Sequence, residues 1–370
     1  MNCASNHDYD RPIRVGIAGL GRSGWHIHAM AMDAVGQEKY EICAVFDLDT
    51  ARSQEAVDKF SAVACESYEE LARFEGIDLI VVATPNHLHA EHAMKALQHG
   101  KHVVIEKPLG CSVAEVLPVI AYANKKGLIC APYQNRRYDP HFLKVMEIVK
   151  SGVLGRVFQI NMTVHAFTRR WDWQTLKEFG GGMLNNTGAH FADQAIQFID
   201  GDNLDVFCHF DRALSMGDAD DHAMIMMRSP GNPFVMLELS SACAKASDLW
   251  LVMGDRGTLW GNMNELHWKT TNFDELPEHE VLRTPTENRW YQFEEVPWEE
   301  HHWKLEGDEA KPTWTLEKYY VDLYATIRQG SQLYVSPESV IRQMRVLEQA
   351  RDSAEAFWSK ANLKPVQLNA

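Results

Sequence analysis

The sequence predicts an α/β protein of two domains, a first domain with a parallel, doubly wound sheet and an α+β second domain with a largely antiparallel, open sheet. Two observations lead to this prediction. In residues 1–134, short β-branched runs alternate with longer helical patterns, as in parallel sheets with crossover helices. In residues 135–370, several strand-like runs follow one another without helices between them, as in antiparallel sheets.

The first domain is expected to place its functional residues along one edge of its sheet. The strand-like runs cover residues 13–18, 40–46, 78–83, 102–105 and 128–131. Helical periodicity lies between them, at residues 51–60, 87–99 and 113–125. Parallel sheets of this kind bind ligands at the carboxyl ends of their strands, so the residues that follow each run are the candidates for function.

The second domain begins with a predicted helix at residues 139–150, which Ser151-Gly152 would end. Alternating, half-buried strand patterns then follow. They cover residues 156–167, 205–210, 222–228, 234–240, 249–253 and 258–261.

The composition excludes several classes of function. The chain has 370 residues and a formal net charge of −15, so nucleic-acid backbones and anionic membrane surfaces are poor partners. No apolar run is long enough to span a membrane, and residues 1–12 lack the apolar core of a signal peptide. The seven cysteines are scattered and form no Cys-x-x-Cys pair, so we expect a protein of the reducing cytoplasm.

A glycine-rich turn follows the first strand. Its sequence is Gly19-Leu20-Gly21-Arg22-Ser23-Gly24, between an apolar run and a helical stretch. In dinucleotide-binding proteins the first glycine makes the turn, the second lets the pyrophosphate approach the backbone, and the third lets the helix pack on the strand. The free amides at the start of the helix then face the phosphates. A plain strand-to-helix turn is the structural alternative.

The second strand is followed by Asp47, whose carboxylate could accept both ribose hydroxyls of an adenosine and repel a 2′-phosphate. This residue favours NAD over NADP as the cofactor. Asp49 is close enough to share this role, and Arg52 could pair with a phosphate. The structural alternative for Asp47 is an N-cap of the following helix.

Two further motifs follow the third and fourth strands. They are Ala83-Thr84-Pro85-Asn86-His87-Leu88-His89 and Glu106-Lys107-Pro108. Both lie at the carboxyl ends of predicted strands, so they share an edge with the glycine turn. A residue before proline is held extended, and the bond between them can be cis. A rigidly held Lys107 beside a cationic nicotinamide would be suited to orient a substrate hydroxyl, and nearby positive charge would lower its pKa.

Together these motifs resemble the Gfo/Idh/MocA family of NAD(P)-dependent oxidoreductases, which act mostly on sugars and cyclitols. The resemblance covers nearly the whole chain, including His28 near the glycine turn. It implies an NAD(P)-binding Rossmann domain in residues 1–134 and a substrate-binding and oligomerisation domain in residues 135–370, with C-terminal helices that pack back on the first domain. The later segments that carry it are Gln134-Asn135-Arg136-Arg137-Tyr138, Gly180-Gly181-Gly182-Met183-Leu184-Asn185-Asn186-Thr187-Gly188-Ala189-His190-Phe191-Ala192-Asp193 and Gly254-Asp255-Arg256-Gly257-Thr258.

By this resemblance Lys107 is the catalytic lysine and His190 is the general base or acid. Family members often carry a carboxylate four residues before this histidine, where this chain has Asn186. An amide can fix the imidazole tautomer or bind a substrate hydroxyl, but it takes no proton. Asp193, three residues after His190, is a candidate partner for it on the same predicted helix face. A buried structural acceptor is the alternative for Asp193.

The motifs and the resemblance assign residues to two ligands. Three of the expected substrate contacts have a structural alternative. It is a salt bridge at the domain junction for Arg136 and a surface loop for Arg170 and Trp173. The expected cofactor contacts are Gly19, Gly21, Arg22, Ser23, Gly24, Asp47, Thr84, Pro85, Asn86, His89, Glu106 and Lys107. The expected substrate contacts are Lys107, Arg136, Arg170, Trp173, Asn186, His190 and Asp193.

Two other features invite a functional interpretation. His87, His89 and His92 lie close in sequence, but no carboxylate or cysteine joins them at a ligand-like spacing, and we expect no metal. Residues 262–311 contain thirteen acidic and five basic residues, and seven of the eleven tryptophans lie between Trp250 and Trp314. Such aromatic residues could stack on sugar rings. A long hairpin packed on the sheet or on a neighbouring subunit is the favoured alternative.

These features favour an NAD-dependent dehydrogenase that interconverts a hydroxyl and a ketone on a sugar, sugar derivative or cyclitol. Lys107 would hold the hydroxyl and His190 would remove its proton. The expected partners are a small carbohydrate or polyol and further copies of the chain, in a homodimer or homotetramer that covers the open sheet. One alternative is a glycoside hydrolase or lyase that oxidises its substrate transiently and regenerates its NAD. Another is a non-catalytic, dinucleotide-sensing regulator.

Overall fold

Six parallel strands form the sheet of the first domain, called sheet A here. The structure, a computed structural model, describes residues 11–284, 286 and 289–360. Every neighbouring pair in sheet A is parallel. The chain builds outward from β1 in both directions, which confirms the predicted doubly wound sheet. The strand order is β3 (Val63–Ala64), β2 (Tyr40–Phe46), β1 (Ile13–Ala18), β4 (Leu79–Val82), β5 (His102–Ile105) and β6 (Cys130–Pro132).

Helices cover both faces of sheet A, because alternate residues of each strand enter different cores. In β4, Leu79 and Val81 belong to a core that includes Met32 and Tyr320. Ile80 and Val82 belong to the core on the opposite face. The first core is closed by α1 (Met30–Val35) and α9 (Trp314–Gln329). The second is closed by α3 (Tyr68–Arg73), α4 (His89–Gln98), α5 (Val113–Lys126) and α10 (Pro337–Lys360). The other helical segments here are η1 (Ser23–Ala29), α2 (Thr50–Phe60) and η2 (Asn86–Leu88).

Eight strands form the sheet of the second domain, called sheet B here. Neighbouring strands are antiparallel, except that β7 and β10 run parallel. The predicted, largely antiparallel sheet is therefore confirmed. The strand order is β14 (Glu299–Lys304), β13 (Glu265–Thr270), β12 (Gly257–Gly261), β11 (Trp250–Gly254), β7 (Val157–His165), β10 (Phe234–Ser240), β9 (His222–Arg228) and β8 (Asp205–Asp211).

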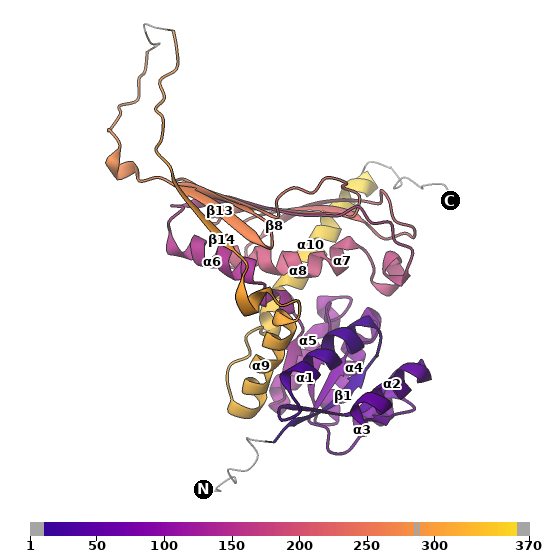
Figure 1. Cartoon of the computed structure of the whole chain (residues 1–370). Helices are drawn as coiled ribbons and strands as arrows, with labels where there is room; N and C mark the ends of the chain where they lie inside the picture. The colour runs from indigo at the N-terminus through magenta and orange to yellow at the C-terminus, as the bar shows by residue number, and fades with distance from the viewer. Residues whose placement is uncertain (1–10, 285, 287–288, 361–370) are drawn as a thin grey trace.

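One face of sheet B packs on helices (Figure 1). These helices are α6 (Pro140–Ser151), α8 (Gly188–Ala195) and α10, all of which contribute to the core of this domain. In β9, Ala223, Ile225 and Met227 are buried toward them, while Met224 and Met226 point to the opposite face and are partly exposed. Within the described part of the chain, no helix covers that opposite face.

Short segments connect these elements and bring the two domains together. Among them, η3 (Asn135–Tyr138) joins the first domain to α6, and α7 (Met183–Asn186) leads into α8. The remaining segments are η3 (Asn135–Tyr138), η4 (Trp173–Thr175), η5 (Lys177–Phe179), α7 (Met183–Asn186), η6 (Ile196–Phe198), η7 (Phe273–Glu275) and η8 (Gly307–Ala310).

Residues 262–311 contain the hairpin that the sequence analysis favoured for them. β13 pairs with both β12 and β14, so the hairpin extends the edge of sheet B. Between the two strands, residues 271–284, 286 and 289–298 belong to an arm that projects from the second domain and away from the first (Figure 1). Residues 285, 287 and 288 of this segment lie outside the described residues. Trp290 and Trp298 belong to the arm, and Trp298 directly precedes β14.

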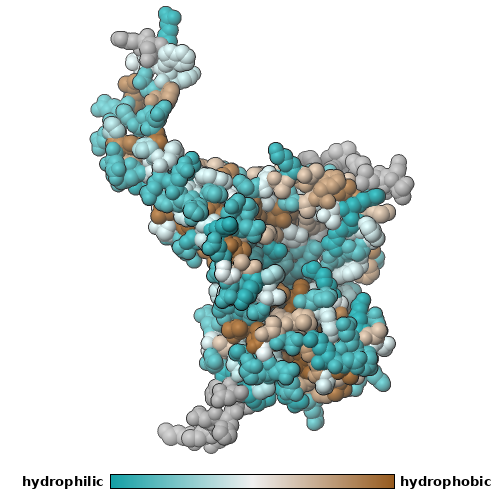
Figure 2. Space-filling view, viewed as in Figure 1, coloured by the Kyte–Doolittle hydropathy of each residue, from teal (hydrophilic) through white to brown (hydrophobic). Residues whose placement is uncertain are grey.

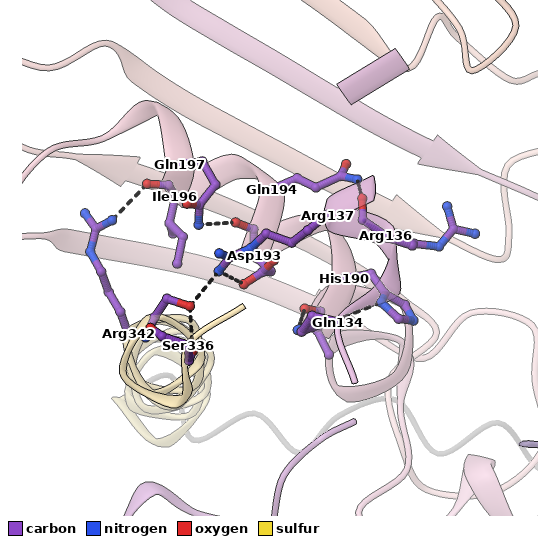
Figure 3. Close-up of polar contacts among 12 residues, drawn as sticks. Gln134, Arg136, Arg137, His190, Asp193, Gln194, Ile196, Gln197, Ser336 and Arg342 are labelled. Carbon is purple, nitrogen blue, oxygen red and sulfur yellow. Dashed lines mark hydrogen bonds and ion pairs between the residues drawn. The ribbon is translucent and has the colours of Figure 1, made fainter. Parts of the chain in front are cut away.

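A buried ion pair joins three helical segments beside the junction. The guanidinium of Arg137, in η3, donates from Nε to Asp193 Oδ2 at 2.5 Å and from Nη2 to Oδ1 at 2.7 Å (Figure 3). Arg137 Nη2 also donates to Ser339 Oγ in α10 at 3.1 Å. The two charged side chains are 8% and 2% exposed. Removing one partner would leave the other buried and uncompensated, which is strongly destabilising.

Asp193→Ala is expected to lower the free energy of unfolding by about 3–5 kcal/mol, because it leaves the Arg137 charge buried without a partner. Chemical denaturation measures the change. The control is Asp202→Ala, whose carboxylate is 83% exposed and lies 3.6 Å from Arg342. This surface pair should contribute less than about 1 kcal/mol. Equal losses in the two variants would contradict the structural role of Asp193.

Candidate active site

The glycine turn after β1 contains two glycines that the fold requires and one that faces open space. A Cβ atom on Gly24 would lie 1.7 Å from Gly19 O, and one on Gly19 would lie 2.5 Å from Ala83 O. A Cβ atom on Gly21 would meet nothing within 4 Å. Arg22 is exposed beside it, and η1 begins at Ser23. The open backbone at Gly21 fits the close approach of a dinucleotide pyrophosphate.

Asp47 lies at the carboxyl end of β2 and is tied to the glycine turn. The Leu20 N–H donates to Asp47 Oδ2 at 2.6 Å, and the Asp49 N–H donates to Oδ1 at 2.8 Å. The N-cap of α2 is Asp49, whose Oδ1 accepts from the Ala51 N–H at 3.0 Å, so Asp47 does not serve as that cap. Arg52 lies 3.7 Å from Asp47 Oδ1 and 3.4 Å from Asp49 Oδ2, so these two carboxylates hold its charge.

The residues after β4 pack against the turn after β5. His89 is buried between two carbonyls, with Nδ1 2.6 Å from Pro108 O and Nε2 2.7 Å from Thr84 O. Burial lowers the pKa of His89 although the two carbonyls oppose this shift. Asn86 follows Pro85 and donates from Nδ2 to Gly180 O of the second domain at 3.3 Å. His89 thus joins the two motifs to each other, and Asn86 joins them to the second domain.

Glu106 anchors the backbone of Lys107 from behind. Its Oε2 accepts the Lys107 N–H at 2.8 Å, and its Oε1 lies 3.3 Å from His28 Nε2. His28 is fully buried and places Nδ1 2.5 Å from the Tyr320 hydroxyl of α9. Burial would raise the pKa of Glu106, but His28 and Lys107 outweigh it and lower the pKa to about 2. The Lys107–Pro108 peptide bond is cis.

The side chain of Lys107 crosses from the first domain to the second. Its Nζ donates to Asn186 Oδ1 at 2.6 Å and to Asn186 O at 3.3 Å. Burial lowers the pKa of Lys107, and the cations of Arg22, Arg136 and Arg170 lower it further, while Glu106 opposes them. This ammonium therefore gives up its proton more readily than a surface lysine does.

The geometry around Gln134 fixes the tautomer of His190 (Figure 3). Gln134 Nε2 donates to Ala189 O at 2.9 Å, so its Oε1 is the acceptor that lies 3.2 Å from His190 Nδ1. His190 must then carry its proton on Nδ1, which leaves the Nε2 lone pair free. Burial and the charges of Lys107 and Arg136 hold the pKa of His190 well below its usual range. The ring is a neutral base.

Asn186 and Asp193 do not contact the His190 ring through any hydrogen bond of the described structure. Asn186 binds Lys107 and donates from Nδ2 to Gln174 Oε1 at 3.3 Å. Asp193 is 1% exposed with both oxygens on Arg137, so it is the buried acceptor that was the alternative for this residue. The motif residue that contacts the imidazole is Gln134, to which the sequence analysis assigned no role. Its position at the start of the Gln134-Asn135-Arg136 segment was the only signal.

Two of the arginines near the lysine, Arg136 and Arg170, are held by carboxylates. Arg136 lies 3.3 Å from Asp139 Oδ2 and 5.1 Å from the centre of the Phe191 ring. Arg170 donates to both oxygens of Asp172 at 2.9 and 2.8 Å, and to Gln174 Oε1 at 2.7 Å. Gln174 therefore links Arg170 to Asn186, a role that sequence reasoning missed.

Two residues of the same region stay at the surface. Trp173 begins the turn η4 and is 43% exposed, and Trp171 is 76% exposed.

Among the described residues, no group of three or more His, Cys, Asp or Glu side chains could hold a metal ion. Within that same part of the chain, no helix is both long enough and apolar enough to cross a bilayer.

Comparisons with known proteins match both domains to one family. Residues 13–134 match the model of the Gfo/Idh/MocA oxidoreductase family with an NAD-binding Rossmann fold. Residues 142–260 match the model of the GFO/IDH/MocA C-terminal domain. Together the two matches cover sheet A and most of sheet B, but β13 and β14 lie beyond them.

Individual relatives extend along most of the chain. The scyllo-inositol 2-dehydrogenase (NADP(+)) IolW of Bacillus subtilis is 26% identical over 362 residues, which are 93% of this chain and 94% of the relative. The inositol 2-dehydrogenase of Salmonella paratyphi B is 26% identical over 253 residues, 66% of this chain and 72% of the relative. The WlbA dehydrogenase of Bordetella pertussis, solved with NADH and UDP-GlcNAcA, has the same fold with a TM-score of 0.74, at 18% identity, over 97% of this chain and 99% of that one.

The glycine turn allows a matched pair of substitutions. Gly21→Ala should keep the stability of the parent protein, because its methyl group meets nothing within 4 Å, but should weaken NADH binding about tenfold or more by keeping the pyrophosphate off the backbone. Gly24→Ala should instead destabilise the protein, because its methyl group would lie 1.7 Å from Gly19 O. Thermal unfolding and a tryptophan-fluorescence titration with NADH measure the two effects. Unchanged NADH binding by Gly21→Ala would contradict the placement of the cofactor.

Proposed function

Because this chain belongs to the Gfo/Idh/MocA oxidoreductase family, we propose that it is a dehydrogenase that interconverts a hydroxyl and a ketone on a sugar, sugar derivative or cyclitol. The observation that carries the proposal is the contact of Lys107 Nζ with Asn186, four residues before His190. The ammonium group of Lys107 and the neutral imidazole of His190, with its unprotonated Nε2, therefore lie next to the proposed dinucleotide site. The relatives named inositol dehydrogenases support a cyclitol or sugar as the substrate.

Lys107 and His190 divide the handling of the substrate hydroxyl. The Lys107 ammonium donates a hydrogen bond to the hydroxyl oxygen, which orients it and makes its proton more acidic. His190 accepts that proton at Nε2, because Gln134 keeps its proton on Nδ1. Asn186 positions the ammonium and contributes a second polar group for the substrate. When bound, the nicotinamide ring supplies the hydride acceptor.

The other residues that the sequence analysis assigned to the site keep their proposed roles. Arg136, Arg170 and Trp173 are proposed substrate contacts at the opening of the site. The proposed cofactor contacts are Gly19, Gly21, Arg22, Ser23, Gly24, Asp47, Thr84, Pro85 and Asn86, whereas His89 and Glu106 support their loops from the buried side. We propose a cytoplasmic enzyme; the buried thiols of Cys65 and Cys130, whose pKa values burial raises to about 11 and about 12, suit such a location.

NAD is the proposed cofactor, rather than NADP. The Asp47 carboxylate would repel a 2′-phosphate, and Arg52, which could attract one, already pairs with Asp47 and Asp49. The Bacillus subtilis relative is named for NADP(+), so the preference needs a direct test in this chain.

We also propose that two or more copies associate through the open face of sheet B and the arm. Strand register aligns Phe207, Met226, Met236, Asn161, Leu251 and Trp260 in one row across that face. Most of this row is apolar, and monomers rarely expose such a surface. In the arm, Tyr291, Phe293 and Val281 are 91%, 87% and 89% exposed. Figure 2 shows hydrophobic residues, in brown, among the hydrophilic residues of the arm.

Lys107→Ala is expected to lower kcat/KM about 1,000-fold, because it removes the group that polarises the hydroxyl. The measurement is NADH release from a panel of inositols, hexoses and aryl glycosides, with NADH binding as evidence that the site is intact. Lys144→Ala is the control, since Lys144 pairs with Glu147 on the outside of α6. Full activity of Lys107→Ala would contradict the mechanism, and release of an aglycone without net NADH would favour transient oxidation.

The pH dependence of oxidation follows from the two shifted groups. His190 must be neutral to accept a proton, so kcat should fall only when the pH drops well below 6.5. Lys107 must be charged. Because its pKa is lowered, kcat should fall again as the pH rises, at a pH below 10.5. Steady-state rates across this range measure both limbs, and Lys107→Arg should move the alkaline limb upward. An acid limb at or above pH 6.5 would contradict the role of His190.

Asp47→Ser should raise the ratio of kcat/KM for NADP to that for NAD about tenfold or more, because the repulsive carboxylate is lost and Arg52 is released. Asp58→Ser is the matched control on the exposed side of α2, where Asp58 accepts only from Gln54. A ratio unchanged by Asp47→Ser would show that another residue sets the preference.

Light scattering at micromolar concentration should give a dimer or a tetramer. Met226→Glu combined with Leu251→Arg places charges in the apolar row and should shift the protein to a monomer. Thermal unfolding of the double variant checks that each subunit stays folded. A monomeric parent protein would contradict the proposed association.

A further inference from the structure

A small polar pocket adjoins the candidate catalytic residues on the side of the second domain. It has a volume of about 30 Å³, which is room for one water molecule or one hydroxyl group. Its polar lining includes Arg170, Gln174, Asn186, Ser215, Asp220 and Ser241. Because Asn186 also binds Lys107 Nζ at 2.6 Å, the pocket opens beside the proposed position of the reacting hydroxyl.

The loop that carries Asp220 is held firmly over the start of α7. Asp220 O accepts the Met183 N–H at 2.8 Å, and Asp220 Oδ2 accepts the Leu184 N–H at 2.8 Å. The next residue, Asp221, accepts three backbone N–H groups, from Ala213, Leu214 and Ser215, and so fixes the rest of the loop. The position of the Asp220 carboxylate is therefore set before any ligand arrives.

The second carboxylate oxygen of Asp220 is available to a ligand. Oδ1 makes no hydrogen bond with another residue in the described structure, although Asp220 is partly buried. Gly182 has a φ of 107°, and a Cβ atom there would lie 2.3 Å from Oδ1, so only glycine leaves room for this oxygen. A carboxylate oxygen has more than one acceptor site, so Oδ1 can accept a hydrogen bond from a hydroxyl group in the pocket.

The charges near Asp220 do not satisfy this oxygen. Arg170 lines the same pocket, but its guanidinium is committed to Asp172. Burial raises the pKa of Asp220 to about 6, although the Leu184 N–H and the more distant cations of Lys177 and Arg351 act to lower it. Asp221 adds a second negative charge to the lining, and the Cys208 thiol nearby is uncharged because burial raises its pKa to about 12.

We propose that this pocket is a hydroxyl-binding subsite, in which Asp220 Oδ1 accepts a hydrogen bond from a substrate hydroxyl on a carbon other than the one oxidised. The inference rests on the proposed function and narrows its substrate class. The substrate is a polyol with a free hydroxyl or hydroxymethyl group at this position. A carboxylate or phosphate group there would meet the charges of Asp220 and Asp221 and be repelled.

The test compares Asp220→Asn with the parent protein, using myo-inositol, scyllo-inositol and D-glucose with NAD as probes. An asparagine oxygen still accepts the Leu184 N–H, so the fold should persist, and thermal unfolding checks this. For the probe that is oxidised, KM should rise about tenfold while kcat stays within about twofold, since a hydrogen bond to a charged group is replaced by a neutral one. The matched control is Asp218→Asn in the same loop, which is exposed and accepts the Lys177 N–H, and its KM should not change.

A pH series and a deoxy analogue of the substrate test the subsite further, because a purely structural role of Asp220 would not produce the effects expected in them. In the parent protein KM should rise as the pH falls through about 6, because Asp220 becomes protonated, and Asp220→Asn should lack this rise. The deoxy analogue without the recognised hydroxyl should show no rise even in the parent protein, so the test holds if the variant fails to fold. Equal KM values in the parent protein and Asp220→Asn, or a loss of kcat alone, would overturn the subsite only. A parent protein that binds NADH but oxidises none of the probes would overturn the proposed function and the subsite with it.

Discussion

The contact between Lys107 and Asn186 is the constraint on which the site depends, because it joins a lysine of the first domain to an amide of the second. Neither domain contains a complete site. The first supplies the lysine at the end of β5 and Gln134 after β6, and the second supplies Asn186 and His190. Helix α9 supports the lysine from behind, since Tyr320 contacts His28, which lies 3.3 Å from Glu106. The last quarter of the chain thus holds the first domain in the form that the site requires.

Electrostatics then assign different states to two neighbouring groups. Burial and nearby positive charge lower the pKa values of both Lys107 and His190. A lysine starts from a pKa far above neutrality and stays charged, whereas an imidazole starts near neutrality and becomes firmly neutral. The same environment therefore produces a cation that can hold an oxygen and a base that can take its proton. The buried Glu106 carboxylate opposes the lowering of the pKa of Lys107.

Much of the fold and part of the site could be predicted from the sequence because they are local. The glycine turn, Asp47 and Glu106-Lys107-Pro108 each follow a strand, and a parallel sheet brings strand ends to one edge. Gln134, Gln174 and Asp220 could not be assigned in this way. Their contacts join segments far apart in the chain, as when Gln134 meets Ala189 or Asp220 meets Leu184. Asp193 had the right spacing from His190, but Arg137 from another element takes both of its oxygens.

In the proposed mechanism, His190 is a neutral base whose free lone pair lies on Nε2, while Lys107 stays charged beside it. Nitrogen NMR of the protein labelled with 15N-histidine tests this directly, with His190→Gln used to assign the signals. We expect that at pH 7 His190 has a protonated Nδ1 and an unprotonated Nε2, and that neither signal titrates until the pH is well below 6.5. An Nε2–H tautomer, or an imidazolium at pH 7, would contradict it.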